Sequence, residues 1–382
     1  MIELFSIPHA CCGCGACADI CPKEAITIQR KDGFDYPVVN QNLCVGCGRC
    51  KSVCTFQKEK VYESNCIAAY ACKSRDSVRM CSSSGGVFTA VSDFVLNMGG
   101  VVYGASFDEA MVLKHTRTTD TAGRDSMRGS KYIQSSTVGV FRSVMQDLRD
   151  DKYVLFTGTP CQVAALKSFL GREYDHLVCV DIICHGVPSP EVWERFVQYI
   201  EKKYSGQLTD YAFRNKTVAW RRYSPTATFA DGRMVGENDH TGSFIELFRY
   251  DVCLRPSCTS CRYASVHREG DLTIGDFWGI ENVFPQLDDN KGVSALMVNT
   301  EKGVAFLRQL QADLELIPCT QEQIATKQPN MFHPSRYSNK AAHFQRDYRE
   351  IPFPAVLRKY TRVGFKRRII DEIKRIMEKE VE

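Results

Sequence analysis

The sequence lacks several features that mark membrane, exported or nucleic-acid-binding proteins. No stretch approaches about 18 uncharged apolar residues, which excludes an ordinary membrane-spanning helix. The first ten residues contain no basic segment followed by an apolar one, so we expect no secretory signal and a cytoplasmic location. The formal net charge is only +4 over 382 residues. Such a small excess does not create a positive field over the whole surface, and we expect no nucleic-acid partner.

A nucleotide-binding motif is also missing, whereas cysteine is abundant. There is no Gly-Lys-Ser or Gly-Lys-Thr triplet, which excludes a Walker phosphate-binding loop. There are 19 cysteines, and nine of them lie within the first 54 residues. An odd number of cysteines in a chain without an export signal argues against a disulfide framework. Cysteines at this density in the cytosol usually bind metals, and their spacing indicates which metal.

The first cysteines follow the spacing C-x2-C-x2-C-x3-C, and the same spacing recurs 33 residues later. The two runs are Cys11, Cys14, Cys17 and Cys21, then Cys44, Cys47, Cys50 and Cys54. This duplication is the signature of a bacterial ferredoxin with two 4Fe-4S clusters, in which the fourth cysteine of each run binds the other cluster. We therefore predict a first cysteine set completed by Cys54 and a second cysteine set completed by Cys21. Zinc rarely uses four cysteines in so tight a run.

The chain length suggests two or three domains of roughly 150 residues. We assign residues 1–62 to a ferredoxin-like module, with a hairpin across Asp32-Gly33 between its two cysteine runs. From Cys66 onward, apolar strands alternate with amphipathic helices, which indicates a large mixed α/β domain over residues 63–330. Residues 331–382 form a C-terminal extension with a basic amphipathic helix. A ferredoxin module transfers electrons and does little other chemistry, so the large domain should hold whatever the electrons serve.

Two polar loops in the large domain are candidates for binding a phosphate. The first, CSSSGG at 81–86, precedes a segment with helical spacing. Small residues at a helix start suit a phosphate, but they are equally explained by helix capping. The second, RGSKYIQS at 128–135, places arginine and lysine beside glycine and serine, which suits a diphosphate.

Two buried strands, expected at 153–156 and 177–183, each end close to a cysteine. Cys161 follows Pro160, a typical first helical residue, so it should lie at a helix N-terminus with a lowered thiol pKa. Cys184 ends the second strand, and His185 beside it is the histidine we favour as a proton carrier.

A C-x2-C pair further along the chain completes the set. Together with Cys161 and Cys184, the cysteines Cys258 and Cys261 predict a third 4Fe-4S site, the third cysteine set. The spacing leaves open whether Cys253 replaces one of these four. A zinc site or a redox dithiol at Cys258 and Cys261 is an alternative.

Six motifs in one order show that the chain resembles the coenzyme F420 hydrogenase/dehydrogenase beta-subunit family. They are CSSSGG at 81–86, RGSKYIQS at 128–135, FTGTPCQVAAL at 156–166, CHGVPSP at 184–190, CLRPSCTSC at 253–261 and DLTIGDFWG at 271–279. The resemblance implies a flavoprotein with FAD and a 4Fe-4S cluster in the large domain. Members pass electrons between clusters and flavin, and the flavin exchanges hydride with a deazaflavin coenzyme or another small organic acceptor.

The resemblance also implies which residues hold the FAD. These are Ser83, Ser84, Gly85 and Gly86 in the first loop, Arg128, Gly129, Ser130, Lys131 and Gln134 in the second, and the strand-end residues Thr157, Gly158 and Thr159. Lys131 is expected near the polar edge of the flavin, where a cation would stabilise the reduced, anionic form. Flavin accepts electrons singly or in pairs, so it connects one-electron clusters with a hydride acceptor.

The last 25 residues carry nine Lys or Arg against five Asp or Glu, which accounts for the whole net charge. A basic helix there suits an anionic membrane surface or a partner, although a helix packed on the main body explains it as well. We predict an iron-sulfur flavoprotein oxidoreductase with a redox partner protein. The alternative functions are a non-catalytic electron-transfer subunit and a dithiol reductase. The sequence leaves the oligomeric state open, a homo-oligomer included.

Overall fold

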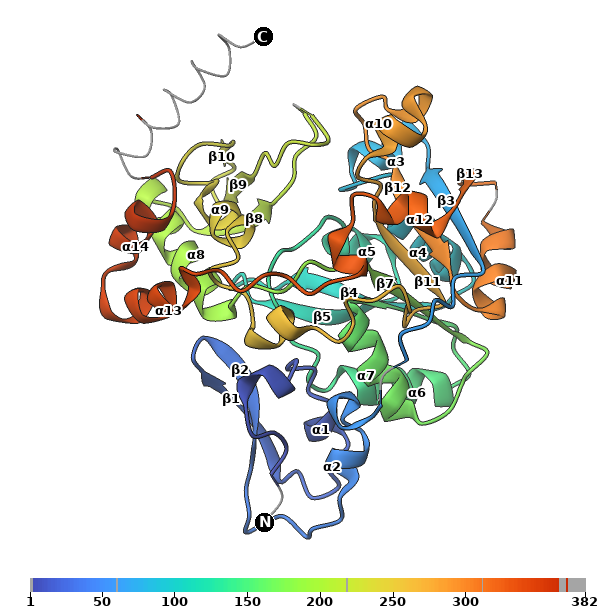
Figure 1. Cartoon of the computed structure of the whole chain (residues 1–382), viewed down its shortest axis with the longest axis horizontal. Coiled ribbons are helices and arrows are strands. Elements are labelled where there is room, and N and C mark those ends of the chain that lie inside the picture. Colours follow the sequence, from blue (N-terminus) through green and yellow to red (C-terminus); the bar gives the residue numbers. More distant parts are fainter. Residues whose placement is uncertain (1–2, 60, 218, 311, 364–368, 370–382) are drawn as a thin grey trace.

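A short antiparallel hairpin and two single-turn helices form the N-terminal module, at the lower end of the molecule in Figure 1. The structure is a computed structural model that describes residues 3–59, 61–217, 219–310, 312–363 and 369. At the hairpin turn, Asp32 and Gly33 have φ of 53° and 82°, the left-handed pair that a two-residue turn requires. The predicted hairpin is confirmed. The module contains η1 (Pro8–Ala10), α1 (Ala16–Asp19), β1 (Ile26–Lys31), β2 (Phe34–Val39), α2 (Arg49–Ser52) and η2 (Thr55–Gln57).

An eight-stranded mixed sheet forms the centre of the large domain (Figure 1). Its strands are β3 (Ala68–Lys73), β4 (Val101–Phe107), β5 (Leu113–Thr118), β6 (Val154–Gly158), β7 (Leu177–Ile182), β11 (Leu272–Asp276), β12 (Ser294–Val298) and β13 (Glu315–Cys319). Their order is β13-β3-β12-β11-β7-β6-β4-β5. The neighbours β11, β7, β6 and β4 are parallel, whereas β5, β12 and β13 are antiparallel to the strands they pair with. The predicted mixed α/β architecture is confirmed.

Five of these strands end at the same edge of the sheet. Besides the four parallel neighbours, β3 has the same direction, because it is antiparallel to β12 and β12 is antiparallel to β11. This carboxyl edge is where open α/β sheets bind their ligands. Cys161 follows β6 by three residues and Cys184 follows β7 by two. The loop at 81–86 follows β3 after the short helix α3 (Asp76–Met80).

Both faces of the sheet are covered, which explains why its central strands are almost entirely apolar. Because side chains alternate along a strand, Val102 of β4 packs in one core and Val101 in the other. One core includes residues of α4 (Val87–Asn97), α5 (Thr121–Met127) and α11 (Glu301–Gln309). The other includes residues of α6 (Val140–Arg149) and α7 (Pro160–Leu170).

A third core lies beside the β5 end of the sheet and surrounds the buried Trp193. Its small sheet consists of β8 (Leu208–Ala212), β9 (Thr226–Phe229) and β10 (Met234–Val235). Helices α8 (Pro190–Tyr204), α9 (Ser243–Arg249), α13 (Ala341–Glu350) and α14 (Phe353–Tyr360) contribute to the same core. The remaining elements are η3 (Pro256–Ser260), α10 (Ile280–Val283), η4 (Pro285–Leu287), α12 (Gln321–Ala325) and η5 (Pro329–Met331).

The predicted basic helix begins within α14, and most of it, residues 364–368 and 370–382, lies outside the described residues. No helix in the described part of the chain is long and apolar enough to cross a membrane.

The carboxylate of Asp147 on α6 ties this helix to strands β4 and β5. It accepts hydrogen bonds from Tyr103 at 2.5 Å, from Arg117 at 2.8 and 2.9 Å, and from Lys152 at 2.9 Å. Burial favours the neutral acid, but the bonds from these three partners outweigh burial and lower the pKa of Asp147 to about 2. The ionised form therefore stabilises the fold above the ordinary carboxyl pKa, and this contribution is lost as the pH falls from about 4 towards 2.

We expect Asp147→Asn to destabilise the protein by about 3 kcal/mol, because it leaves two cations near a buried site without their counter-charge. Urea unfolding at pH 7, followed by tryptophan fluorescence, measures the change. Asp150→Asn is the matched control: this neighbour on the same helix end is 47% exposed and lies 4.0 Å from Lys152. Equal effects of the two substitutions would contradict the role given to Asp147.

Candidate metal centres and cofactor loops

The two cysteine runs of the module have the same backbone conformation. Gly13 and Gly46, 33 residues apart, have φ of 71° and 70°, and Gly15 and Gly48 have φ of 73° and 74°. Gly15 and Gly48 each stand directly before a single-turn helix, α1 or α2. Left-handed backbone at four matching positions requires glycine, because a side chain there would be strained. The sequence duplication is therefore a structural duplication.

The fold brings Cys54 to the first run and Cys21 to the second, as the ferredoxin spacing predicts. The thiol of Cys17 is buried, and burial together with the nearby thiols of Cys14, Cys11 and Cys54 raises its pKa. On the other side of the module, the pKa of Cys50 is raised by burial and by Cys21 and Cys44. A small pocket is lined by all four members of the second cysteine set, Cys21, Cys44, Cys47 and Cys50.

The third cysteine set is assembled from three segments at the carboxyl edge of the sheet. Burial, followed by the thiols of Cys258, Cys161 and Cys261, raises the pKa of Cys184 well above its ordinary value. Burial also raises the pKa of Cys258 to about 12 and that of Cys261 to about 11. The backbone N–H of Val187 donates to the sulfur of Cys258 at 3.4 Å. Such thiols stay protonated at neutral pH unless a metal displaces the proton.

Cys253 lies elsewhere, and the question left open by its spacing can now be addressed. Its side chain is fully buried in the third core, which also contains Trp193 and Phe244. Burial and the nearby charge of Asp251 raise the pKa of its thiol. These surroundings are those of a structural, apolar cysteine.

The spread of the cysteine sets bears on the kind of metal they suit. Among the described residues, no three His, Cys, Asp or Glu side chains are close enough together to hold a single metal ion. A 4Fe-4S cluster places several iron and sulfide atoms between its thiolates, so its ligands surround a space instead of meeting at one point. The three sets therefore fit clusters and not preformed sites for a single zinc ion.

Cys12 lies where the first and third cysteine sets approach each other. Its thiol interacts with both Cys14 and Cys161, and these two contacts raise its own pKa well above the ordinary value. The contact with Cys12, followed by the hydroxyl of Thr159, lowers the pKa of Cys161 to about 7 despite burial. The predicted lowering at Cys161 is confirmed, but a neighbouring thiol is its leading cause and not the helix terminus.

The strand-end residues before Cys161 shape this site. Thr159 and Gln162 form a reciprocal capping box at the start of α7, which fixes the helix turn that carries Cys161. Thr157 donates its hydroxyl to the carbonyl of Tyr103 at 3.1 Å, and its own carbonyl lies 2.9 Å from His115 Nε2. Burial lowers the pKa of His115 to about 4, so this histidine is neutral at physiological pH.

The two candidate flavin loops meet at one hydrogen bond, from the Ser130 N–H to Ser83 Oγ at 2.7 Å. Next to it, Lys131 donates from Nζ to the carbonyls of Arg128 and Gly129 at 2.8 and 3.4 Å. Burial lowers the pKa of Lys131 to about 8. The Nε of Arg128 is buried without a hydrogen-bond partner among the described residues. An orphaned cationic N–H beside a lysine that has only carbonyl partners fits an anionic ligand such as a diphosphate.

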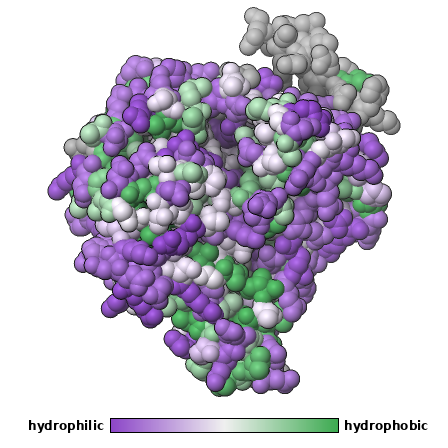
Figure 2. Space-filling view, turned by 180° about the vertical axis from the view of Figure 1, so that it is seen from behind, coloured by the Kyte–Doolittle hydropathy of each residue, from purple (hydrophilic) through white to green (hydrophobic). Residues whose placement is uncertain are grey.

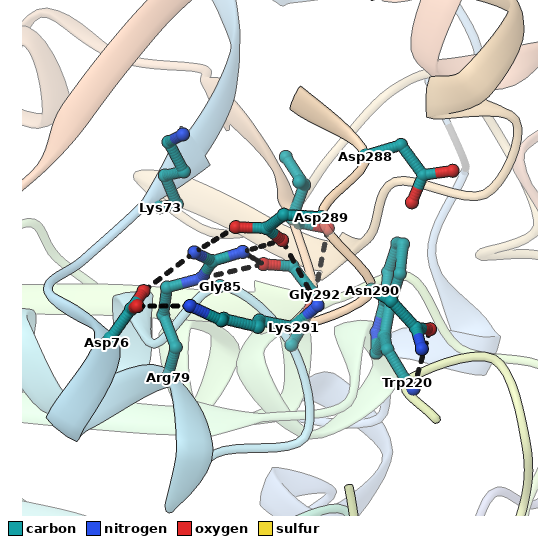
Figure 3. A network of polar contacts seen from close by, with 12 residues as sticks. Lys73, Asp76, Arg79, Gly85, Trp220, Asp288, Asp289, Asn290, Lys291 and Gly292 are labelled. Carbon is teal, nitrogen blue, oxygen red and sulfur yellow. Dashed lines mark hydrogen bonds and ion pairs between the residues drawn. The ribbon is translucent and has the colours of Figure 1, made fainter. Parts of the chain in front are cut away.

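The other loop, at 81–86, is held firmly by a polar network (Figure 3). Arg79 donates to both carboxylate oxygens of Asp289 at 2.7 and 2.5 Å and to the carbonyl of Gly292 at 3.1 and 2.9 Å. Ser84 donates to the carbonyl of Val293, and the Gly85 N–H donates to Ser294 Oγ. A side chain at Gly85 would collide with the backbone of Cys72 and Ser294. Ser84 and Gly85 thus support the loop from within.

Lys216 is a site residue that sequence reasoning missed. Its buried Nζ donates to the carbonyls of Arg79, Ser84 and Lys291 at 2.8, 2.5 and 2.7 Å. Burial is the main cause that lowers its pKa, to about 7. No motif surrounds Lys216 in the sequence, and its partners lie 75 to 137 positions away. Only the fold shows its role.

His185 pairs with a carboxylate, as a proton-carrying histidine requires. Its Nε2 lies 2.6 Å from Asp251 Oδ1, and its Nδ1 lies 3.2 Å from Asn330 Oδ1. Burial lowers the pKa of His185, but the hydrogen bond and charge of Asp251 outweigh this and raise it. Gln134 lies apart from the flavin loops' meeting point: its amide contacts the carbonyl of Cys12 at 3.2 Å and the guanidinium of Arg255 at 2.8 Å.

The third cysteine set can be tested by iron content. We expect Cys184→Ser to lower the iron of anaerobically purified protein from about twelve to about eight atoms per chain, because one 4Fe-4S site loses a ligand. Cys253→Ala is the control, since that thiol packs in an apolar core, and it should keep the full iron content. The reverse pattern would show that Cys253 is the ligand.

Comparison with known proteins adds independent evidence. Residues 10–58 match the 4Fe-4S dicluster domain family, and residues 151–322 match the family described as the C terminus of the coenzyme F420 hydrogenase/dehydrogenase beta subunit. No curated protein sequence matches the chain. Among solved structures, a chain of the xenon-derivatised F420-reducing NiFe hydrogenase complex from Methanosarcina barkeri is similar, with 15% identity over 72% of this chain and 92% of that one and a TM-score of 0.47. The two family matches show that the chain belongs to the coenzyme F420 hydrogenase/dehydrogenase beta-subunit family and carries a 4Fe-4S dicluster domain at its N-terminus.

Proposed function

We propose that this protein is an iron-sulfur flavoprotein oxidoreductase, which passes electrons between 4Fe-4S clusters and, through FAD, a deazaflavin coenzyme or another small organic acceptor. The observation that carries the proposal is the order of its sites in space. The second cysteine set lies at the surface, the first lies at the junction of module and large domain, and the third lies next to the first. The loop at 128–135 then leads from this junction to the candidate flavin loops.

The order of the first two sets follows from how the matching glycines are packed. A side chain at Gly13 would collide with Gln134 and Arg255 of the large domain. At the matching Gly46, a side chain would meet nothing within 4 Å. Cys47, one residue further along, is exposed. The first set is therefore the inner one and the second set faces the solvent.

The loop at 128–135 connects the cysteine sets with the candidate flavin site. At one end, Ser130 bonds to Ser83, and at the other, Gln134 bonds to the carbonyl of Cys12. Four residues of fully extended chain span at most about 14 Å. The two ends of the loop are thus close enough for a flavin held by Arg128 and Lys131 to lie beside the cysteine sets. Flavin would supply the exchange between single electrons and a hydride.

Metal and flavin analysis of the anaerobically purified protein tests this proposal directly. About twelve iron atoms and one FAD per chain support it. About eight iron atoms without flavin would instead support a non-catalytic carrier that feeds a partner enzyme. Reduction of a deazaflavin by the dithionite-reduced protein, followed by the absorbance of the deazaflavin, then distinguishes this acceptor from other organic acceptors.

Lys131 provides a test of the flavin site. We expect Lys131→Ala to weaken FAD binding roughly ten- to a hundredfold, as the loss of a hydrogen bond to a charged group does, and to lower the flavin potential. FAD retained after gel filtration and a redox titration of the flavin measure both effects. Lys114→Ala is the control, because Lys114 is 52% exposed and pairs with Asp108. Unchanged affinity and potential would remove Lys131 from the flavin site.

The exposed second cysteine set suits a redox partner protein of negative charge. Apolar side chains of Leu43 and Val45 beside it are 52% and 62% exposed, and Figure 2 shows apolar residues gathered on the protruding module. Lys23, Arg49 and Lys51 are exposed nearby, and none of them forms an ion pair with a described carboxylate. An apolar centre with unpaired cations favours an acidic one-electron carrier.

We expect the double substitution Arg49→Glu and Lys51→Glu to slow reduction by an acidic ferredoxin about tenfold at low salt, because the steering field is reversed. Stopped-flow absorbance of the clusters measures the rate. Reduction by dithionite should be unchanged, and Lys202→Glu, at an exposed position of α8, should keep the wild-type rate with both donors. A ferredoxin rate that does not respond to the reversal would place the docking surface elsewhere.

A further inference from the structure

Arg255 has an unusual position at the junction of the module and the large domain. Its side chain is fully buried, and its backbone leads into η3, which carries Cys258. The Arg255 N–H donates to the carbonyl of Val187, and the Cys258 N–H donates to the carbonyl of Arg255, both at 2.9 Å. The main chain of Arg255 therefore supports the third cysteine set while its side chain extends into the module.

The guanidinium of Arg255 contacts the module at several points. Nε donates to the carbonyl of Cys11 at 2.9 Å, and Nη2 donates to the carbonyl of Asp35 at 3.1 Å and lies 3.7 Å from the sulfur of Cys11. Nη1 donates to Gln134 Oε1 at 2.8 Å. The ring of Tyr36 lies 4.4 Å from the guanidinium carbon, a distance typical of a cation–π contact.

No described carboxylate forms an ion pair with Arg255, which sets it apart from the other buried arginines. Each of those four pairs with an aspartate, namely Arg79 with Asp289, Arg124 with Asp93, Arg214 with Asp276 and Arg268 with Asp181. Burying a cation without a counter-charge costs several kcal/mol. The nearby anions that offset this cost are sulfur atoms of two cysteine sets.

The charge of Arg255 reaches both sets. It contributes to lowering the pKa of Cys11 and Cys14 in the first set, and of Cys161 and Cys258 in the third. Among the causes that shift the pKa of Cys50, in the second set, the neighbours are Cys21 and Cys44 and not Arg255. The cation thus lies between the first and third sets and away from the second.

We propose that Arg255 is a shared counter-cation of the first and third cysteine sets, which raises the reduction potential of the clusters they hold and fixes the two sets against each other. This inference rests on the proposed function, because it requires 4Fe-4S clusters at both sets. Reduction of a cluster adds one negative charge, and a buried cation stabilises the more negative state. One cation acting on both clusters moves both potentials in the same direction, so they remain close to each other.

The side chain at this position must be arginine for both parts of the role. The planar guanidinium donates in three directions at once, to Cys11, Asp35 and Gln134. A lysine would keep the charge but not this fork of donors. Arg255→Lys therefore separates the charge from the hydrogen bonds, and Arg255→Gln removes the charge.

The test is an EPR-monitored redox titration of the holoprotein. For Arg255→Gln, we expect two of the three cluster potentials to become more negative while the third, that of the second set, stays at the wild-type value. For Arg255→Lys, all three potentials should stay near wild type, while limited proteolysis between residues 59 and 66 becomes faster as the module loosens.

Arg142→Gln is the matched control. Arg142 also donates to module carbonyls, those of Asp19 at 2.6 Å and Ala18 at 3.0 Å, but its side chain is 44% exposed and lies 3.7 Å from Glu24. Its substitution should leave all potentials unchanged.

Each outcome distinguishes the inference from the proposed function. Fully loaded Arg255→Gln protein with unshifted potentials would overturn the role of Arg255 and leave the proposed function intact. If Arg255→Gln loses iron while Arg255→Lys keeps it, the need for the cation is supported. Loss of iron in both variants would show that hydrogen bonding and not charge matters, which overturns the counter-cation. Wild-type protein with only about eight iron atoms would overturn the proposed function itself.

Discussion

Burial of sulfur at a junction between two parts of the chain is the constraint on which the rest of the structure depends. Thiolates that bind metal carry negative charge, and a low-dielectric surrounding makes that charge costly unless donors and cations offset it. The protein supplies backbone N–H groups, such as that of Val187 to Cys258 and that of Ala25 to Cys21. It also supplies Arg255. The same groups hold the module in place, so the docking of the module and the electrostatics of its sulfur atoms are one feature.

The duplicated module shows how a symmetric sequence acquires different roles through its surroundings. Its two halves have matching glycines with almost equal φ, yet one half packs against the large domain and the other faces solvent. The position of Cys12 in the first run corresponds to Val45 in the second, and Val45 is 62% exposed while Cys12 contacts Cys14 and Cys161. The extra thiol thus belongs to the junction and not to the ferredoxin pattern. Its meaning depends on Cys161, a partner 149 positions later in the chain.

The sequence predicts those features that depend on residues close together in the chain. The ferredoxin runs, the hairpin at Asp32-Gly33, the strands before Cys161 and Cys184 and the cap of α8 by Ser189 are local patterns, and the structure contains all of them. The third cysteine set combined three segments, and it was predictable because parallel strands end at one edge of a sheet. Arg255 and Lys216 were not predictable, since Arg255 contacts Cys11 across 244 positions. Gln134 was assigned to FAD by its motif, but its contacts are with Arg255 and Cys12.

Buried cations without carboxylate partners follow the same path as the cysteines. Arg255 lies at the junction, Lys131 in the loop that leads away from it, and Lys216 under the loop that bonds to Lys131's neighbour Ser130. The two lysines have only backbone carbonyls as hydrogen-bond partners, and burial lowers the pKa of both. A fold that needed these groups only for stability would have paired them, as it pairs its four other buried arginines. An anionic ligand at the loops and reduced clusters at the junction would each bring the missing negative charge. The distribution of unpaired cations therefore favours a redox site in which the protein is complete only with its cofactors bound.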